Sequence, residues 1–124
     1  MKTIKTILVI DDSSTSVFLM ESLLKEEGYD AIVATSGEKG LTIIAKNQPD
    51  LILLDIMMPG KSGFDVLEEL QADPKTKDIP VIIISARIEH AEQEKGLALG
   101  AKSYLTKPLD FDTLFKTIKG IENL

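Results

Sequence analysis

The chain has 124 residues and a formal net charge of −6, with 44% hydrophobic and 27% charged residues. This balance is typical of a soluble globular protein, so we expect a single domain over residues 1–124. The negative charge argues against direct nucleic-acid binding, which needs a basic surface. Cysteine is absent, which excludes disulfides and thiolate zinc sites. With no apolar run of membrane-spanning length and no signal-peptide pattern, the expected protein is cytoplasmic and has no membrane contact.

Short apolar runs alternate with longer amphipathic stretches along the chain. Continuous apolar runs are typical of parallel strands that are buried on both faces. Five strands are expected, at residues 5–10, 31–34, 51–54, 81–84 and 102–106. Strands that alternate with helices indicate a parallel sheet with helices on both faces. The pattern therefore predicts an α/β fold in which a βα unit is repeated five times, giving a three-layer sandwich.

The first two helices have recognisable end signals. Gly28 is expected to end the first helix, because glycine commonly follows a helix C-terminus. Thr35 and Glu38 have the spacing of a capping box, which predicts that Thr35 opens the second helix. The apolar side chains expected to face the core from the first helix are Leu19, Met20, Leu23 and Leu24.

The remaining helices differ in strength. Asp73-Pro74 is expected to end the third helix, and Asp110 to cap the fifth. Residues 88–98 form the weakest helix, because Gly96 lies inside it and it has few large apolar residues.

Polar residues stand at the ends of four of the predicted strands. Asp11 and Asp12 follow the first strand, Asp55 the third, Ser85 the fourth and Lys107 the fifth. The carboxyl ends of parallel strands are where ligands bind in open α/β sheets, so these groups are expected to converge. Crowded carboxylates repel one another unless a cation neutralises them, and hard oxygen ligands suit Mg²⁺. A lysine nearby suits phosphate.

Each of these residues, taken alone, also has an ordinary structural explanation, such as a helix cap or a solvated loop. Tyr104, near the end of the fifth strand, can pack inward or point to solvent. His90 is the only histidine, which favours a surface role over a zinc site. Met57-Met58 has no other soft ligand nearby. The joint placement at four strand ends is what favours a functional site.

The ordered set resembles the receiver domain of response regulators in two-component signalling, of the type found in chemotaxis regulators. It comprises Asp11-Asp12, Asp55, Pro59-Gly60-Lys61-Ser62-Gly63, Ser85, Tyr104 and Lys107-Pro108. The resemblance covers the whole chain and implies a flavodoxin-like sheet with strand order 2-1-3-4-5.

The resemblance also implies residue roles. Asp55 would accept a phosphoryl group from the phosphohistidine of a histidine kinase or a histidine phosphotransfer protein. Mg²⁺, or Mn²⁺, would be bound directly by Asp12, Asp55 and the Met57 backbone carbonyl, and by Asp11 through water. Lys107 would contact the phosphoryl group.

Signalling would follow from a coupled movement of Ser85 and Tyr104. Ser85 would bind the phosphoryl group and Tyr104 would turn inward, changing the surface formed by the fourth helix, fifth strand and fifth helix. His90 would lie on that partner surface. Such a domain catalyses only its own phosphorylation and dephosphorylation and is not an enzyme in the usual sense.

Two residues depart from the family pattern. Many members have a polar residue where Met57 stands, and an apolar thioether cannot readily orient a hydrolytic water, so slow dephosphorylation is expected. Phe18 stands where many relatives have an arginine or another polar residue. It is expected either to be exposed as a docking residue for the phosphodonor or to pack in the core.

Three other functions are compatible with parts of this pattern. A pseudo-receiver would use the same fold as a docking module without phosphorylation. A phosphatase of the haloacid dehalogenase type also uses an aspartate nucleophile with Mg²⁺, but it has its second aspartate two residues after the first. A flavodoxin-like cofactor binder would need a phosphate loop where Asp11-Asp12 stands, and these carboxylates would repel the phosphate. The phospho-switch accounts for the whole site.

Overall fold

The computed structural model describes residues 3–123, in which five strands alternate with five helices. The strands are β1 (Thr6–Ile10), β2 (Asp30–Ala34), β3 (Leu51–Leu54), β4 (Val81–Ser85) and β5 (Ser103–Thr106). They form one parallel sheet in the order β2-β1-β3-β4-β5. The predicted α/β fold and strand order are therefore confirmed.

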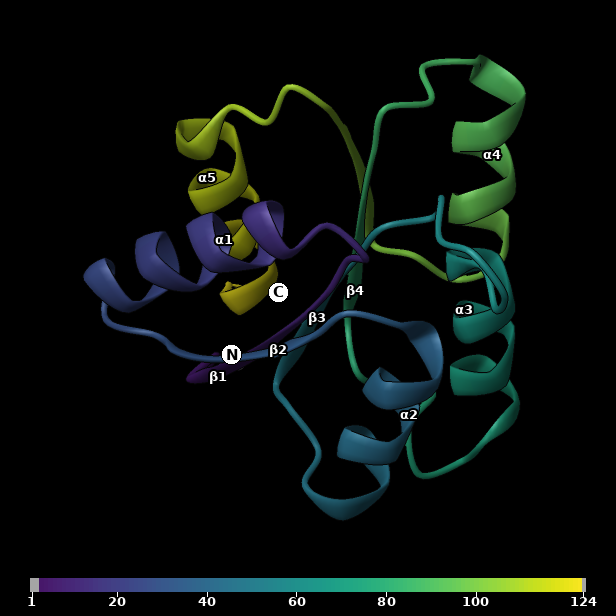
Figure 1. Ribbon diagram of the computed structural model, residues 1–124, viewed down its shortest axis with the longest axis horizontal. Helices are drawn as coiled ribbons and strands as arrows, with labels where there is room; N and C mark the ends of the chain where they lie inside the picture. Colours follow the sequence, from purple (N-terminus) through teal and green to yellow (C-terminus); the bar gives the residue numbers. More distant parts are fainter. Residues whose placement is uncertain (1–2, 124) are drawn as a thin grey trace.

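The helices cover both faces of the sheet. They are α1 (Ser14–Glu26), α2 (Gly37–Lys46), α3 (Gly63–Ala72), α4 (His90–Ala98) and α5 (Phe111–Glu122). Figure 1 shows α1 and α5 together on one side of the strands and α2, α3 and α4 on the other. Within residues 3–123, no helix has both the length and the apolar character required to cross a lipid bilayer.

The core has two layers because side chains alternate between the faces of each strand. Leu8 and Ile10 of β1 belong to the cluster that packs under α2 and α3. Ile7 and Val9 belong to the cluster under α1 and α5. Both faces are covered, so every strand residue from 7 to 10 is buried. This double burial explains why the strands are continuous apolar runs.

Three of the four predicted helix ends are confirmed. Gly28 follows α1 with a φ of 95°, a left-handed conformation that favours glycine. Asp73 is the C-terminal flanking residue of α3. Asp110 caps α5, and its side chain accepts a hydrogen bond from the Asp112 backbone N–H.

The remaining prediction, that Thr35 caps the start of the second helix, was wrong by one residue. Ser36, not Thr35, caps α2, and its hydroxyl accepts a hydrogen bond from the Lys39 backbone N–H at 3.1 Å. Two adjacent hydroxyl residues offered alternative caps, and Glu38 favoured the first only through the capping-box spacing.

The expected inward face of α1 was also partly wrong. Val17, Met20 and Leu24 form its buried stripe, while Leu23 is half-buried and Leu19 is half exposed. The buried positions are three and four residues apart, as a helical stripe requires, and Leu19 lies beside that stripe. It lines a cavity next to the strand ends instead of filling the core.

Candidate functional site

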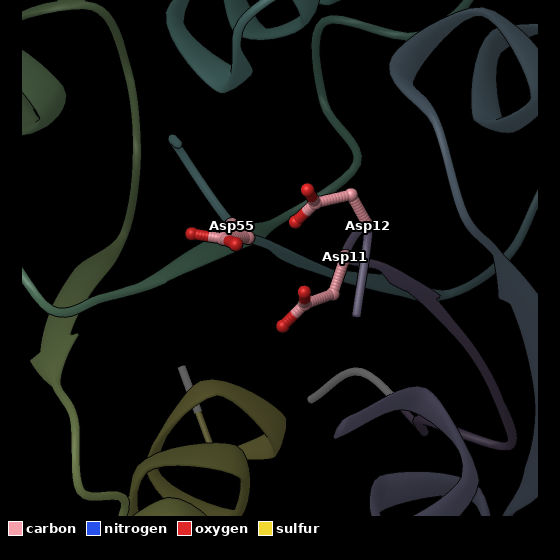
Figure 2. Close-up of side chains that lie close together, drawn as sticks. All are labelled: Asp11, Asp12 and Asp55. Atoms are coloured by element: carbon pink, nitrogen blue, oxygen red, sulfur yellow. The ribbon is translucent and has the colours of Figure 1, made fainter. Parts of the chain in front are cut away.

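The backbone of β1 and β3 brings the three aspartates together. The two strands pair in register, with Ile10 opposite Leu54. The Asp55 backbone N–H then donates to the Ile10 carbonyl at 2.9 Å, so Asp55 lies next to Asp11 across the sheet edge. Figure 2 shows Asp11 and Asp12 at the end of β1, with their side chains directed toward Asp55.

The three carboxylates form a compact group with one open side. Asp11, Asp12 and Asp55 each offer an oxygen within 4.8 Å of the others. Asp11 and Asp55 are both only 6% exposed, whereas Asp12 is exposed to solvent. Backbone N–H groups fix the two buried side chains: Ser13 donates to Asp11 Oδ1 at 2.9 Å and Met57 donates to Asp55 Oδ1 at 3.2 Å. Backbone hydrogen bonds therefore fix the orientation of the two buried carboxylates, and solvent reaches the group at Asp12.

Lys107 lies against the two buried carboxylates. Its Nζ is 3.1 Å from Asp11 Oδ2 and 3.7 Å from Asp55 Oδ2. The Lys107 backbone N–H donates to the Ser85 carbonyl at 2.8 Å, which ties this residue to the end of β4. The following Lys107–Pro108 peptide bond is cis. One ammonium thus contacts two of the three acidic side chains, and negative charge remains in excess.

This excess charge changes the proton affinities of the site. Burial, followed by the charge of Asp11, raises the pKa of Asp55 from 3.8 to about 6, although Lys107 and the Met57 N–H act in the opposite direction. Burial acts to lower the pKa of Lys107, but the hydrogen bond to Asp11 and the charge of Asp55 outweigh it and raise that pKa. A further cation would relieve the remaining repulsion.

Ser85 and Tyr104 contact the same residue, Arg87, which the sequence analysis did not single out. Ser85 is fully buried, and its hydroxyl accepts a hydrogen bond from the Arg87 backbone N–H at 3.1 Å. Tyr104 is half-buried, and its hydroxyl donates to the Arg87 carbonyl at 2.8 Å. No sequence pattern marked Arg87, because both contacts are made by its backbone.

Gly63, which the sequence analysis named only as part of the loop that follows the third strand, lies against the backbone of Asp55. A Cβ atom at this position would lie 2.3 Å from the Asp55 carbonyl oxygen and 2.6 Å from Ile56 Cα. The start of α3 can therefore approach the backbone of Asp55 only because residue 63 has no side chain. Ser62 caps α3 in a capping box with Asp65, which fixes this start. The glycine directly after a capping serine was the available signal.

Three other predicted site residues lie at the surface. Phe18 on α1 is 70% exposed, and Met57, after β3, is 51% exposed. His90, the first residue of α4, is also exposed, and its Nε2 lies 2.9 Å from Glu94 Oε1. The structure therefore agrees with the exposed alternative for Phe18.

A cavity of about 310 Å³ adjoins the acidic group. Apolar residues form most of its lining, among them Leu19 and Met20 of α1 and Phe111 at the start of α5. Asp11, Asp55 and Lys107 also line it. The acids therefore have a solvated side at Asp12 and an apolar neighbourhood between α1 and α5.

The donor set fits a hard divalent cation. Asp11, Asp12 and Asp55 supply carboxylate oxygens, which Mg²⁺ prefers, and burial together with the charge of Asp11 raises the pKa of Asp55. A buried carboxylate beside a cation and an ammonium is also equipped for phosphoryl transfer, which depends on positioning and charge neutralisation.

Comparison with known proteins gives a consistent result. The family model described as "Response regulator receiver domain" matches residues 7–119. Protein PilH of Pseudomonas aeruginosa is 37% identical over 115 residues, covering 93% of this chain and 95% of PilH. Response regulator PleD of Caulobacter vibrioides is 42% identical over 115 residues, covering 93% of this chain but 25% of PleD.

A solved structure extends the likeness to the fold. A putative response regulator from Chloroflexus aurantiacus has a TM-score of 0.92 and 31% identity, covering 98% of this chain and 100% of that chain. Receiver domains bind Mg²⁺ at an acidic pocket, are phosphorylated by histidine kinases, and are generally switches, not enzymes in the usual sense. This chain belongs to the response regulator receiver domain family of two-component signalling and has the phosphoacceptor role of that family.

Proposed function

We propose that Asp55 is the phosphoacceptor. A carboxylate oxygen of Asp55 attacks the phosphorus of a phosphohistidine; the new P–O bond forms as the P–N bond breaks, and the imidazole leaves. The observation that carries this assignment is the position of Asp55. It is buried at 6% exposure, oriented by the Met57 N–H, and has Oδ2 3.7 Å from the Lys107 ammonium. Asp12 is exposed, and Asp11 is already paired with Lys107 at 3.1 Å.

The same group is proposed to hold Mg²⁺, or Mn²⁺. Asp12 and Asp55 would bind the ion directly and Asp11 through water, with the Met57 backbone carbonyl completing the protein ligands. The mutual distance of 4.8 Å or less and the excess negative charge support this assignment. The bound ion would neutralise charge on the transferred phosphoryl oxygens. Lys107 would exchange part of its contact with the aspartates for the phosphoryl group.

Ser85 and Tyr104 are proposed to form the switch. The Ser85 hydroxyl would turn to the phosphoryl group and give up its bond from the Arg87 N–H. Tyr104, which bonds the carbonyl of the same residue, would then change its packing against α4. The affected partner surface would comprise α4, β5 and α5, including His90. Phosphorylation shifts this equilibrium only to the extent that the phosphoryl group makes more favourable contacts in one state than in the other.

Phe18 is proposed as an anchor for the protein that donates the phosphoryl group, either a histidine kinase or a histidine phosphotransfer protein. Its 70% exposed ring is on α1, and the neighbouring Leu19 lines the apolar cavity that adjoins Asp55. A large exposed apolar group beside a reactive site favours a partner contact.

The remaining proposals concern context. Residues 1–124 would act as one domain, in the cytoplasm, and without direct nucleic-acid contact by this chain, in line with its net charge of −6. The principal alternative is a pseudo-receiver that docks without phosphorylation, and a magnesium-dependent phosphatase is a weaker one. The complete acidic group favours the phospho-switch over both.

Incubation with a small acyl phosphate and Mg²⁺ should add one phosphoryl group per chain, measured by intact mass. Asp55→Asn should abolish the addition, because the amide is not a competent nucleophile, and chelation of Mg²⁺ should reduce it strongly. Glu94→Gln, which changes an exposed carboxylate on α4, is the control. Addition to Asp55→Asn at the wild-type rate would assign the acceptor elsewhere, and no addition to the wild type would favour the pseudo-receiver.

Without divalent metal, Asp55→Asn should also stabilise the fold near pH 8. The fold raises the pKa of Asp55 from 3.8 to about 6, so the native state binds this proton more tightly than the unfolded chain. The tighter binding of this proton therefore stabilises the fold fully below pH 3.8, and this stabilisation is lost as the pH rises through about 6. Urea unfolding at pH 8 should show a gain of about 1–2 kcal/mol for the variant.

The stability gain of Asp55→Asn should shrink toward pH 4, where the wild-type carboxyl is protonated. It should also shrink on addition of Mg²⁺, since the ion stabilises the wild-type carboxylates. A variant that is no more stable than wild type at pH 8 would contradict the proposed charge repulsion.

Met57→Asn should speed the loss of phosphate from phosphorylated protein by about threefold or more, because an amide can orient the attacking water and a thioether cannot. The rate is measured from the decay of the phosphorylated mass after the donor is removed. Met58→Asn is not a suitable control because Met58 is buried, whereas Leu97→Asn changes a similarly exposed side chain on α4. Equal or slower decay in Met57→Asn would contradict the role given to Met57.

Phe18→Ala should slow phosphotransfer from the cognate phosphohistidine protein by about tenfold, the effect of losing a buried aromatic anchor. Phosphorylation by the small acyl phosphate should be unchanged, since that donor needs no docking surface. Leu97→Ala serves as the control, because Leu97 is another exposed large apolar residue but lies on α4. Unchanged transfer from the protein donor would assign the docking site to another surface.

A further inference from the structure

We propose that Arg87 is a positioning residue that couples Ser85 to Tyr104, and that its ion pairs with Glu89 and Glu92 set the strength of this coupling. The inference rests on the proposed switch at Ser85 and Tyr104. It assigns a role to a side chain outside the acidic group and to the start of α4.

The first step is the backbone of Arg87. Its N–H donates to the Ser85 hydroxyl at 3.1 Å, and its carbonyl accepts from the Tyr104 hydroxyl at 2.8 Å. These groups belong to the two peptide units that flank one Cα atom. Both hydrogen bonds therefore constrain the φ and ψ angles of Arg87, and a change in these angles alters the direction of its N–H relative to its carbonyl.

The second step is the side chain of Arg87, which ties this backbone to α4. Its Nε lies 3.2 Å from Glu89 Oε2 and its Nη2 lies 3.6 Å from Glu92 Oε1. Glu89 precedes α4 and Glu92 lies in its first turn. The guanidinium therefore bridges the loop after β4 and the first turn of the helix.

The third step is that α4 is weakly held by other means. In the described part of the chain, Gly96 is the one fully buried residue of this helix, and Glu89 makes no side-chain capping bond to it. A helix with so little buried side chain belongs to the low-stability end of a fold. The two ion pairs therefore add to the few other contacts of this helix, among them the Lys95 ammonium over the Phe64 ring at 4.4 Å.

The fourth step is the contact between α4 and the Tyr104 ring. A Cβ atom at residue 96 would lie 3.3 Å from Tyr104 Cδ2 and 2.5 Å from Ile83 Cδ1. The ring thus lies against helix backbone where no side chain intervenes. Tyr104 is consequently held at two points, its hydroxyl by the Arg87 carbonyl and its ring by α4, and the Arg87 side chain connects these two points.

The test uses 3-fluorotyrosine and ¹⁹F NMR, because the chain has two tyrosines and Tyr29→Phe assigns the two resonances. In unphosphorylated protein, Arg87→Gln should shift or broaden the Tyr104 resonance and leave that of Tyr29 unchanged. Arg87→Lys should restore most of the wild-type signal. The control is Lys25→Gln, which removes an ion pair of similar length to Glu21 on α1.

The second arm adds a small acyl phosphate and Mg²⁺, and records the ¹⁹F spectrum and the intact mass of the same sample. Arg87→Gln should still add one phosphoryl group per chain, which shows that the acceptor site is intact. The balance between the two Tyr104 states should change by roughly two- to fivefold, the range expected for partly exposed ion pairs. Salt at about 0.5 M should move the wild type in the same direction as the variant.

An unchanged Tyr104 resonance in Arg87→Gln, both at rest and after phosphate uptake, would overturn the proposal. Failure of the wild type to take up phosphate would instead overturn the proposed function. In that case the resting spectra alone still decide whether Arg87 positions Tyr104.

Discussion

Repulsion between the buried carboxylates of Asp11 and Asp55 is the constraint on which the site depends. The pairing of β1 with β3 makes this contact unavoidable, because the register places the two residues side by side. Lys107 relieves part of the repulsion from the end of β5, while burial and the charge of Asp11 together still raise the pKa of Asp55. The fold therefore holds a charge imbalance at one edge, which a cation or a change in charge on Asp55 can exploit.

The rest of the molecule can be understood as support for this edge. Strands buried on both faces fix the backbone positions of the acids, and two N–H groups fix their side-chain orientation. The fourth strand and α4 differ from this rigid frame. Ser85 is buried at the site, but α4, the helix that follows it, has little buried surface. A conformational change at the aspartates can therefore be transmitted through Ser85 to the surface at α4.

Much of this arrangement could be predicted from the sequence, because parallel topology converts strand-end residues into neighbours. Asp11, Asp55 and Lys107 are far apart along the chain, and the apolar run before each one located it at the same sheet edge. Asp110 was a correct helix cap for a similarly local reason. The prediction that Thr35 caps the second helix was wrong because the adjacent Ser36 offers the same hydroxyl group. The prediction that Leu19 faces the core was wrong because apolar character does not distinguish a core position from a cavity wall.

The contacts of Arg87 could not be predicted from the pattern of residue types, and for Gly63 the pattern marked the glycine but not the backbone that it approaches. Arg87 contacts Ser85 and Tyr104 through its N–H and carbonyl, which every residue except proline has. Its ion-pair partners became apparent only when the start of α4 was placed next to it. For Gly63, the requirement is the space left by a missing side chain, and that space is defined by Asp55 and Ile56.

The close approach at Gly63 has a further consequence for how the site can adapt. Since the first residue of α3 lies against the carbonyl of Asp55, uncharged backbone fills the space on that side of the residue. The Asp55 carboxylate is contacted by the Met57 N–H and the Lys107 ammonium. Substitutions near Met57 and Lys107 can therefore alter the surroundings of this carboxylate, whereas the close approach of α3 leaves little room for a change.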